Sequence, residues 1–261
     1  MIGIIIAAGL GSRMRELTKD KPKCLLKING KSLIEWNYQS LLQIGCENIY
    51  VITGYKQEKI VDLGYKTIFN KDFRKNNVLH SLMSAVNLFD HELIISYADI
   101  YLEKFIYEEL FNIKKDIVIS VDGDWQDYYN DRLGVPISQS ENLSLDKYGN
   151  VFEIGKQVKV DTKKKYFEFT GIFKTSLEGS YLIKNTFLKL NKVLKKNDIF
   201  LHGKTWYKSD ISDLLHYMIK NNIIDVTPHI ISKGWAEFDT KEDYLRLEKI
   251  KYSQKLKSII S

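Results

Sequence analysis

A glycine-rich segment with one arginine follows the first apolar run of the chain. Gly9 and Gly11 would let backbone amides close on a triphosphate, and Arg13 would neutralise its charge. The Gly-Lys-Ser of a Walker loop is absent, so a tight strand-to-helix turn is the alternative interpretation. The residues predicted to contact a nucleotide here are Ala7, Ala8, Gly9, Leu10, Gly11 and Ser12.

Lys23 comes directly after the first proline of the chain. Pro22 holds the backbone extended and would present the Lys23 ammonium to phosphates in a cleft. There the ammonium would stabilise negative charge that builds on a phosphate. Because the apolar residues 24–26 follow, an ordinary solvated lysine is the alternative.

Acidic residues end two strand-like runs that are far apart in the sequence. Asp99 follows the apolar run 93–97, where a carboxylate could hold a hard cation such as Mg²⁺ against phosphates. The spacing of Glu237 and Asp239 predicts that both carboxylates lie on the same face of a strand. Capping of the following segment is the alternative role for Asp99 and for Asp239.

The opening signature of one enzyme family stands near the N-terminus. Ala-Ala-Gly-x-Gly-x-Arg-Met occupies residues 7–14, and Pro-Lys occupies residues 22–23. On these motifs the chain resembles the sugar-nucleotide pyrophosphorylase-like nucleotidyltransferases. The likeness covers nearly the whole chain, and its later elements look most like the choline-phosphate cytidylyltransferase branch, with similarity to the capsule-pathway CTP:phosphoglutamine cytidylyltransferases. Those later elements are Asn70 and residues 76–81, 97–99 and 235–239.

This resemblance implies a Mg²⁺-dependent cytidylyltransferase. It would transfer CMP from CTP to a small phosphorylated zwitterion (phosphoglutamine, phosphocholine or an aminoalkylphosphonate), release pyrophosphate and serve surface polysaccharide modification. Arg13 and Lys23 would be the catalytic residues. Since relatives use two distant acidic residues, Asp99 and Asp239 would hold Mg²⁺, with Glu237 in a supporting or alternate role. No general base is required, because the acceptor's phosphate oxygen is already a nucleophile.

Asn77 and Ser81 are candidates for contact with the base of the nucleotide. Asn77 and Ser81 lie four residues apart and would share one face of a helix, where amide and hydroxyl groups could pair with the edge of cytosine. Helix capping is an equal alternative for Asn77. The choice of CTP over UTP comes from the resemblance and not from these side chains.

Two polar and aromatic clusters are candidates for the acceptor site. Aromatic rings with an acid would suit a quaternary ammonium, whereas Arg132, Lys204 or Lys208 would suit a carboxylate or a phosphate. The lysines favour an acceptor other than choline. Packing beneath surface loops is the alternative for each residue. The candidates are Trp125, Tyr129, Arg132, Lys204, Tyr207, Lys208 and Asp210.

Two other functions remain as alternatives. A hexose-1-phosphate nucleotidylyltransferase would use UTP or dTTP, but the C-terminal Glu-Phe-Asp differs from the Asp-Thr-Gly-like ending of those enzymes. A regulatory module could bind nucleotides without catalysis. The joint presence of Arg13, Lys23, Asp99 and Asp239 argues against it.

These residues need secondary structure that brings them to one edge of a sheet. Apolar runs predict strands at residues 2–8, 48–53, 66–69, 92–97, 116–121 and 224–227. Helical spacing predicts helices at 32–45, 78–88, 106–113, 182–194, 209–220 and 241–259, the last capped by Thr240. We therefore predict one α/β domain over residues 1–261: a doubly wound, mostly parallel (Rossmann-like) mixed sheet flanked by helices, with a small antiparallel extension at residues 143–174.

The composition limits the partners. The 261 residues carry 39 Lys plus Arg against 33 Asp plus Glu, spread without a basic stripe, so small anions such as CTP and a phosphorylated metabolite are favoured over nucleic acid. Cys24 and Cys46 form no CxxC motif, which is typical of a cytoplasmic protein. No run is long enough to span a membrane. A homodimer is left open, since no heptad seam indicates where one would form.

Overall fold

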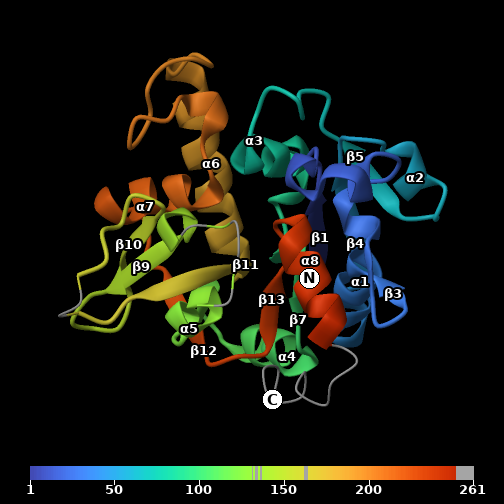
Figure 1. The fold of residues 1–261 in the computed structure, drawn as a ribbon. Coiled ribbons are helices and arrows are strands. Elements are labelled where there is room, and N and C mark those ends of the chain that lie inside the picture. The colour runs from blue at the N-terminus through green and yellow to red at the C-terminus, as the bar shows by residue number, and fades with distance from the viewer. Residues whose placement is uncertain (131, 133–134, 136, 162–163, 251–261) are drawn as a thin grey trace.

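The computed structural model describes residues 1–130, 132, 135, 137–161 and 164–250. Within them the chain forms a nine-stranded mixed sheet with helices on both faces (Figure 1). Its central path runs in the order β10-β9-β11-β6-β1-β4-β5. This confirms the predicted doubly wound α/β class.

The parallel half of the sheet is built from the apolar runs of the first hundred residues. β1 (Ile2–Ala7) pairs in parallel with β4 (Asn48–Thr53) on one side and with β6 (Leu93–Tyr97) on the other. β5 (Lys66–Phe69) pairs in parallel with β4. Neighbouring residues of a strand enter different cores, as Ile4 and Ile5 do, because both faces of the sheet are covered.

Each face carries its own set of helices. One is covered by α1 (Leu33–Gln43), α2 (Glu58–Val61) and α4 (Lys104–Asn112). The other is covered by α3 (Val78–Leu82), η3 (Met83–Leu88), α6 (Leu177–Val193) and α7 (Ile211–Lys220). α1 begins with a capping box in which the Ser32 side chain and Glu35 satisfy each other's backbone N–H groups.

The antiparallel extension is the other half of the molecule. β11 (Phe167–Thr175) lies antiparallel to β6 and also to β8 (Ile117–Asp122). β8 in turn pairs in parallel with β12 (Thr227–Ile231). β9 (Asn142–Leu145) and β10 (Val151–Gly155) form a hairpin at the edge, beside α5 (Trp125–Asn130) and α7 (Figure 1).

Short elements complete the framework around the parallel strands. A two-stranded sheet joins β7 (Ile100–Leu102) to β13 (Trp235–Glu237), and β2 (Lys27–Ile28) pairs with β3 (Lys31–Ser32). The β7–β13 pairing brings the C-terminal part of the chain beside β7, as Figure 1 shows. The remaining helices are η1 (Ser12–Thr18), η2 (Lys23–Leu25), η4 (Ile137–Gln139), η5 (Trp206–Lys208) and α8 (Lys241–Ile250).

Four predicted elements differ from the structure. The helix predicted at 182–194 begins earlier, at Leu177, because the Ser176 side chain caps it by accepting from Gly179 N. The helix predicted at 78–88 is divided, because Ala85 leaves helical geometry and the second part is a 3-10 helix. The strand predicted at 224–227 begins only at Thr227, since Ile223 and Ile224 pack against the core from the turn after α7. The last helix is described to Ile250, and residues 251–259 of the prediction lie outside the described residues. No helix of the described part is long and apolar enough to cross a membrane.

Candidate active site

The glycine-rich segment forms the first wall of the site, at the carboxyl end of β1. Gly11 has a φ of 63°, in the left-handed region, and a Cβ there would lie 3.1 Å from Lys23 Cβ. Its conformation therefore lets the loop pack against Lys23. Ala8 is buried, and its carbonyl accepts a hydrogen bond from the Tyr55 N–H at 3.4 Å.

A cavity of about 380 Å³ opens beside this loop. Asn76, Asn77 and Lys208 also line it, as do Lys23, Asp99 and Asp239. The residues of the loop that line it are Ala7, Gly9, Leu10, Gly11, Ser12 and Arg13. All of the predicted nucleotide loop except Ala8 thus faces one cavity.

Asn77 and Ser81 do not share a helical face, because α3 begins at Val78 and Asn77 has extended backbone. The Asn77 amide lines the cavity and donates to Asp210 Oδ1 at 2.6 Å. Ser81 is buried behind it, where its hydroxyl accepts from Asn70 Nδ2 at 2.9 Å. Ser81 therefore contacts Asn70 inside the protein, whereas Asn77 is placed for contact with a ligand.

The predicted metal ligands lie together although 140 positions separate Asp99 from Asp239 in the numbering. Lys23 Nζ lies 2.7 Å from Asp99 Oδ2 and 3.3 Å from Asp239 Oδ1. Burial alone would lower the pKa of Lys23, but the two carboxylates raise it above its ordinary value. Lys23 is thus the charged counter-ion of the pair.

Asp239 is held by the start of α8. The prediction that Glu237 and Asp239 share a strand face is wrong, because β13 ends at Glu237. Asp243 Oδ2 accepts from the backbone N–H groups of Asp239 and Thr240, at 3.3 and 3.0 Å. Thr240 Oγ1 accepts from Asp243 N at 3.1 Å, so Thr240 caps the helix as predicted. These contacts fix the Asp239 backbone, and the Asp239 carboxylate itself faces the site.

Arg13 reaches the same place from the glycine-rich segment. Its Nη1 lies 2.6 Å from Asp239 Oδ2 and donates to Gln139 Oε1 at 3.2 Å. Just over half of its side chain is exposed. The guanidinium can therefore also contact a bound anion.

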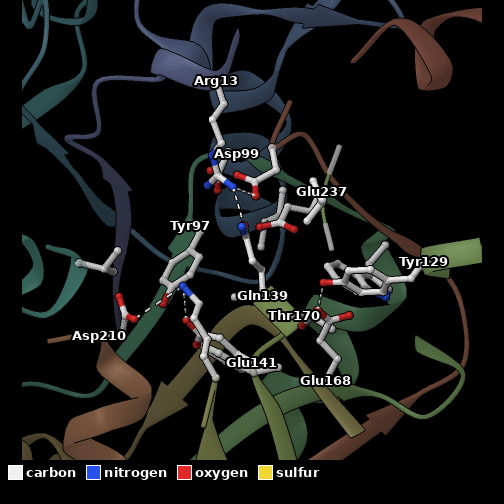
Figure 2. Close-up of a pocket in the computed structure, with 18 of the residues that line it drawn as sticks. Arg13, Tyr97, Asp99, Tyr129, Gln139, Glu141, Glu168, Thr170, Asp210 and Glu237 are labelled. Atoms are coloured by element: carbon white, nitrogen blue, oxygen red, sulfur yellow. Dashed lines mark hydrogen bonds and ion pairs between the residues drawn. The ribbon is translucent and has the colours of Figure 1, made fainter. Parts of the chain in front are cut away.

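A second cavity, of about 200 Å³, adjoins the first and shares Arg13, Asn77, Asp99 and Asp239 with it. Figure 2 shows Arg13 and Asp99 at one end of this cavity, Glu141 and Asp210 at the other, and Tyr129 and Glu168 along the side. The two cavities meet at the predicted metal ligands. The two cavities could therefore each bind one small molecule, and the two molecules would touch where the cavities meet.

The predicted acceptor residues divide into two groups. Tyr129 and Asp210 line the second cavity, and the Tyr129 hydroxyl donates to Glu168 Oε1 at 2.6 Å. Trp125 is buried behind Tyr129 and donates to the Tyr166 carbonyl at 3.2 Å.

The other predicted acceptor residues do not line the second cavity. Lys204 Nζ pairs with Asp210 and Asp213, at 2.8 and 2.9 Å. The Tyr207 hydroxyl donates to Asp72 at 2.7 Å, and Lys208 lines the first cavity. The side chains of Lys204 and Tyr207 thus make their polar contacts within the protein, although their residue types would also suit a ligand.

Arg132 is fully buried in an ionic network. Its guanidinium makes two hydrogen bonds of 3.0 Å to the Asp243 carboxylate and one of 3.1 Å to Glu237 Oε2. Burial raises the pKa of Glu237 to about 7, and Asp239 adds to the rise. Because Asp243 also holds the Asp239 backbone, Arg132 supports the site from beneath.

Loss of Arg132 should be strongly destabilising. Arg132→Met leaves the Asp243 carboxylate buried without this partner, and removing one member of a buried pair costs about 3–5 kcal/mol. Lys104→Met, which breaks the exposed Lys104–Glu108 pair on α4, should cost less than about 1 kcal/mol. Denaturant unfolding measures both changes, and equal effects would show that the network contributes little.

Several residues of the second cavity were not predicted. Glu141, Lys156 and Glu168 come from the antiparallel extension, and Tyr97 and Gln139 complete the wall. One signal was available: Glu168 stands between Phe167 and Phe169 in a strand that is buried throughout. A carboxylate in such a strand indicates a polar site.

Comparisons with known proteins identify the family of the chain and its fold. The profile of the MobA-like NTP transferase domain matches residues 3–136. The chain is 28% identical to the CTP:phosphoglutamine cytidylyltransferase of Campylobacter jejuni, over 93% of this chain and 97% of that protein. It is 39% identical to the choline-phosphate cytidylyltransferase of Streptococcus pneumoniae, over 40% of this chain and 47% of that one. The solved structure of the S. pneumoniae CTP:phosphocholine cytidylyltransferase has the same fold, with a TM-score of 0.73 and 23% identity over 95% of this chain and 98% of that chain.

Proposed function

Because the chain belongs to the family of MobA-like NTP transferase domains, we propose that it transfers CMP from CTP to a small phosphorylated zwitterion and releases pyrophosphate. The nucleotide follows from the two similar proteins, which are both cytidylyltransferases. The acceptor classes that we propose are phosphoglutamine, phosphocholine and aminoalkylphosphonates. The product would serve surface polysaccharide modification, and we place the reaction in the cytoplasm.

The observation that carries this proposal is the pair of adjoining cavities. They share Arg13, Asn77, Asp99 and Asp239. A nucleotide in the first cavity and an acceptor in the second would meet at this shared wall, where an acceptor oxygen can approach the α-phosphorus in line. Holding two reactants in that geometry supplies a large part of the acceleration of a group transfer.

Asp99 and Asp239 are the residues that would hold Mg²⁺. Their oxygens lie within 2.7 and 3.3 Å of one Lys23 nitrogen, so both carboxylates face the same point. No group of three or more metal-ligating side chains occurs in the described parts of the chain. Two carboxylates fit Mg²⁺, which usually takes one or two from the protein and completes its shell with phosphates and water. When bound, the ion would neutralise charge on the phosphates.

The chain's own residues complete the chemistry by binding and neutralising charge. Arg13 stands where the two cavities meet and can contact phosphate from either side. Lys23 carries a full positive charge beside Asp99 and can stabilise charge that builds on the transferred phosphate. The acceptor's phosphate oxygen is the nucleophile, and therefore no proton has to be removed before it attacks.

A substrate panel tests the proposal. Pyrophosphate release is measured with CTP, UTP or dTTP against phosphocholine, phosphoethanolamine, 2-aminoethylphosphonate, L-glutamine phosphate and glucose-1-phosphate. We expect CTP with one zwitterionic acceptor to exceed every other pair. Turnover of UTP or dTTP with glucose-1-phosphate would assign the chain to the hexose branch instead. No turnover with any pair would favour a regulatory protein that binds nucleotides.

A further inference from the structure

One lysine of the second cavity lies between two carboxylates without a close contact to either. Lys156, just after β10, has its Nζ 3.6 Å from Glu141 Oε1 and 3.7 Å from Asp210 Oδ2. Both distances exceed those of a hydrogen bond. The Lys156 side chain is 42% exposed, whereas those of Glu141 and Asp210 are 13% and 4% exposed. The ammonium can therefore turn toward a ligand if another cation takes its place beside Glu141.

Carboxyl groups outnumber cationic side chains in the lining of this cavity. Two cationic side chains, Arg13 and Lys156, face six carboxylates. Arg13 stands at the end where the cavities meet. Lys156 is the nearest cation to Glu141 at the other end, where Lys204 contacts Asp210 from outside the described lining. The carboxylates are Asp99, Glu141, Glu168, Asp210, Glu237 and Asp239.

Buried acceptor atoms at this end are suited to a hydrogen-bonding cation. Among the described residues, Glu141 Oε2 and the Tyr97 hydroxyl are buried and have no hydrogen-bond partner. Burial raises the pKa of Glu141 above its ordinary value, and an entering cation would offset that desolvation. A primary ammonium brings three N–H donors to such a site.

The aromatic rings give less support to a quaternary ammonium. The Arg132 guanidinium already lies over the Tyr129 ring, 5.0 Å from its centre. The Tyr97 ring packs edge-on against Phe169, with 6.0 Å between ring centres. A cage for a quaternary ammonium needs several open ring faces around one point. The carboxylates and buried acceptor atoms of this cavity are therefore better matched to a primary ammonium.

We infer that the acceptor is a phosphorylated α-amino acid and that Lys156 selects it by pairing with its carboxylate. This inference rests on the proposed cytidylyl transfer. When Lys156 turns to the ligand's carboxylate, Glu141 loses its nearest cation and takes up the ligand's ammonium in its place, while Lys204 stays paired with Asp210. The phosphate of the acceptor then lies toward Arg13. Lys156 is thus a specificity-determining residue that the sequence motifs do not include.

The test uses acceptor pairs that differ only in the carboxylate. L-glutamine phosphate is compared with the phosphate of 4-aminobutanamide, and O-phospho-L-serine with phosphoethanolamine, each with CTP and the full chain. Wild type should prefer the member with the carboxylate. Lys156→Met should lower kcat/KM for that member about 10- to 100-fold, the range of a lost charged hydrogen bond. It should change kcat/KM for the member without the carboxylate by less than about twofold. Lys156→Arg should keep the preference, and Lys156→Glu should reverse it.

Lys147→Met is the matched control. Lys147 is exposed at the turn of the same hairpin and lies over Tyr148, outside the second cavity, so its loss removes the same charge without touching the acceptor. In Lys147→Met, the ratio of kcat/KM between the two members of each acceptor pair should equal that of wild type. A wild-type preference for the decarboxylated members, or equal losses for both members in Lys156→Met, would overturn the inference while cytidylyl transfer stands. Absence of turnover with every acceptor would overturn the proposed function itself.

Discussion

Asp99→Asn should lower kcat by about a hundredfold or more while the protein stays folded. The substitution keeps the size of the side chain but removes the negative charge that would hold Mg²⁺ against the phosphates. Metal stabilisation of charge contributes several kcal/mol, and each 1.36 kcal/mol is tenfold in rate. Asp239→Asn should behave in the same way, because its carboxylate faces the same point. Steady-state kinetics at saturating CTP measure the loss.

Asp90→Asn serves as the control for this pair of variants. Asp90 is also a carboxylate that a lysine contacts, Lys184 at 2.8 Å, but it is exposed and lies outside both cavities. Its activity should match that of wild type. If Asp99→Asn kept full activity in Mg²⁺, the assignment of Asp99 as a metal ligand would be wrong.

Lys23→Met should lower kcat by about a hundredfold to a thousandfold, the size of effect seen when one fixed charge-stabilising donor is lost. The Lys23 ammonium is only 13% exposed and is bound by two carboxylates, so its position is fixed before a nucleotide arrives. Because the carboxylates raise the pKa of Lys23 above its ordinary value, the wild-type side chain stays charged throughout a neutral assay. The loss should therefore not vary between pH 6 and 9.

The Lys23 variant also removes the counter-ion of Asp99 and Asp239, so stability has to be measured beside activity. Lys184→Met breaks the exposed pair with Asp90 and should leave kcat unchanged. Thermal unfolding of both variants separates a folding defect from a catalytic one. A folded Lys23→Met enzyme with wild-type kcat would remove Lys23 from the mechanism.

The parallel half of the fold could be predicted from the sequence, and so could the residues at its edge. β1 and β4 are buried on both faces, and their runs of apolar residues are therefore continuous and easily recognised. The glycine-rich segment and Lys23 come soon after β1 in the sequence. Asp239 required the resemblance to known enzymes, because nothing local shows that β13 will lie beside β7 and bring it to Asp99.

The acceptor cavity could not be predicted, because its walls depend on pairing between distant strands. Glu141, Lys156 and Glu168 meet only after β9, β10 and β11 have assembled. The predicted cluster at 202–210 has suitable residue types, but Lys204 and Tyr207 are bound by Asp213 and Asp72 instead. Residue type alone does not tell a ligand contact from an internal ion pair.

In the proposed reaction CMP, and no other part of CTP, is joined to an acceptor phosphate. Phosphorus NMR of a reaction with CTP, Mg²⁺ and L-glutamine phosphate tests it directly, because each phosphate of the product has its own signal. We expect a new diphosphate bond between CMP and the acceptor, formed together with one pyrophosphate for each acceptor consumed. Pyrophosphate without that bond, or orthophosphate with CDP, would show hydrolysis or transfer of another phosphate and would contradict it.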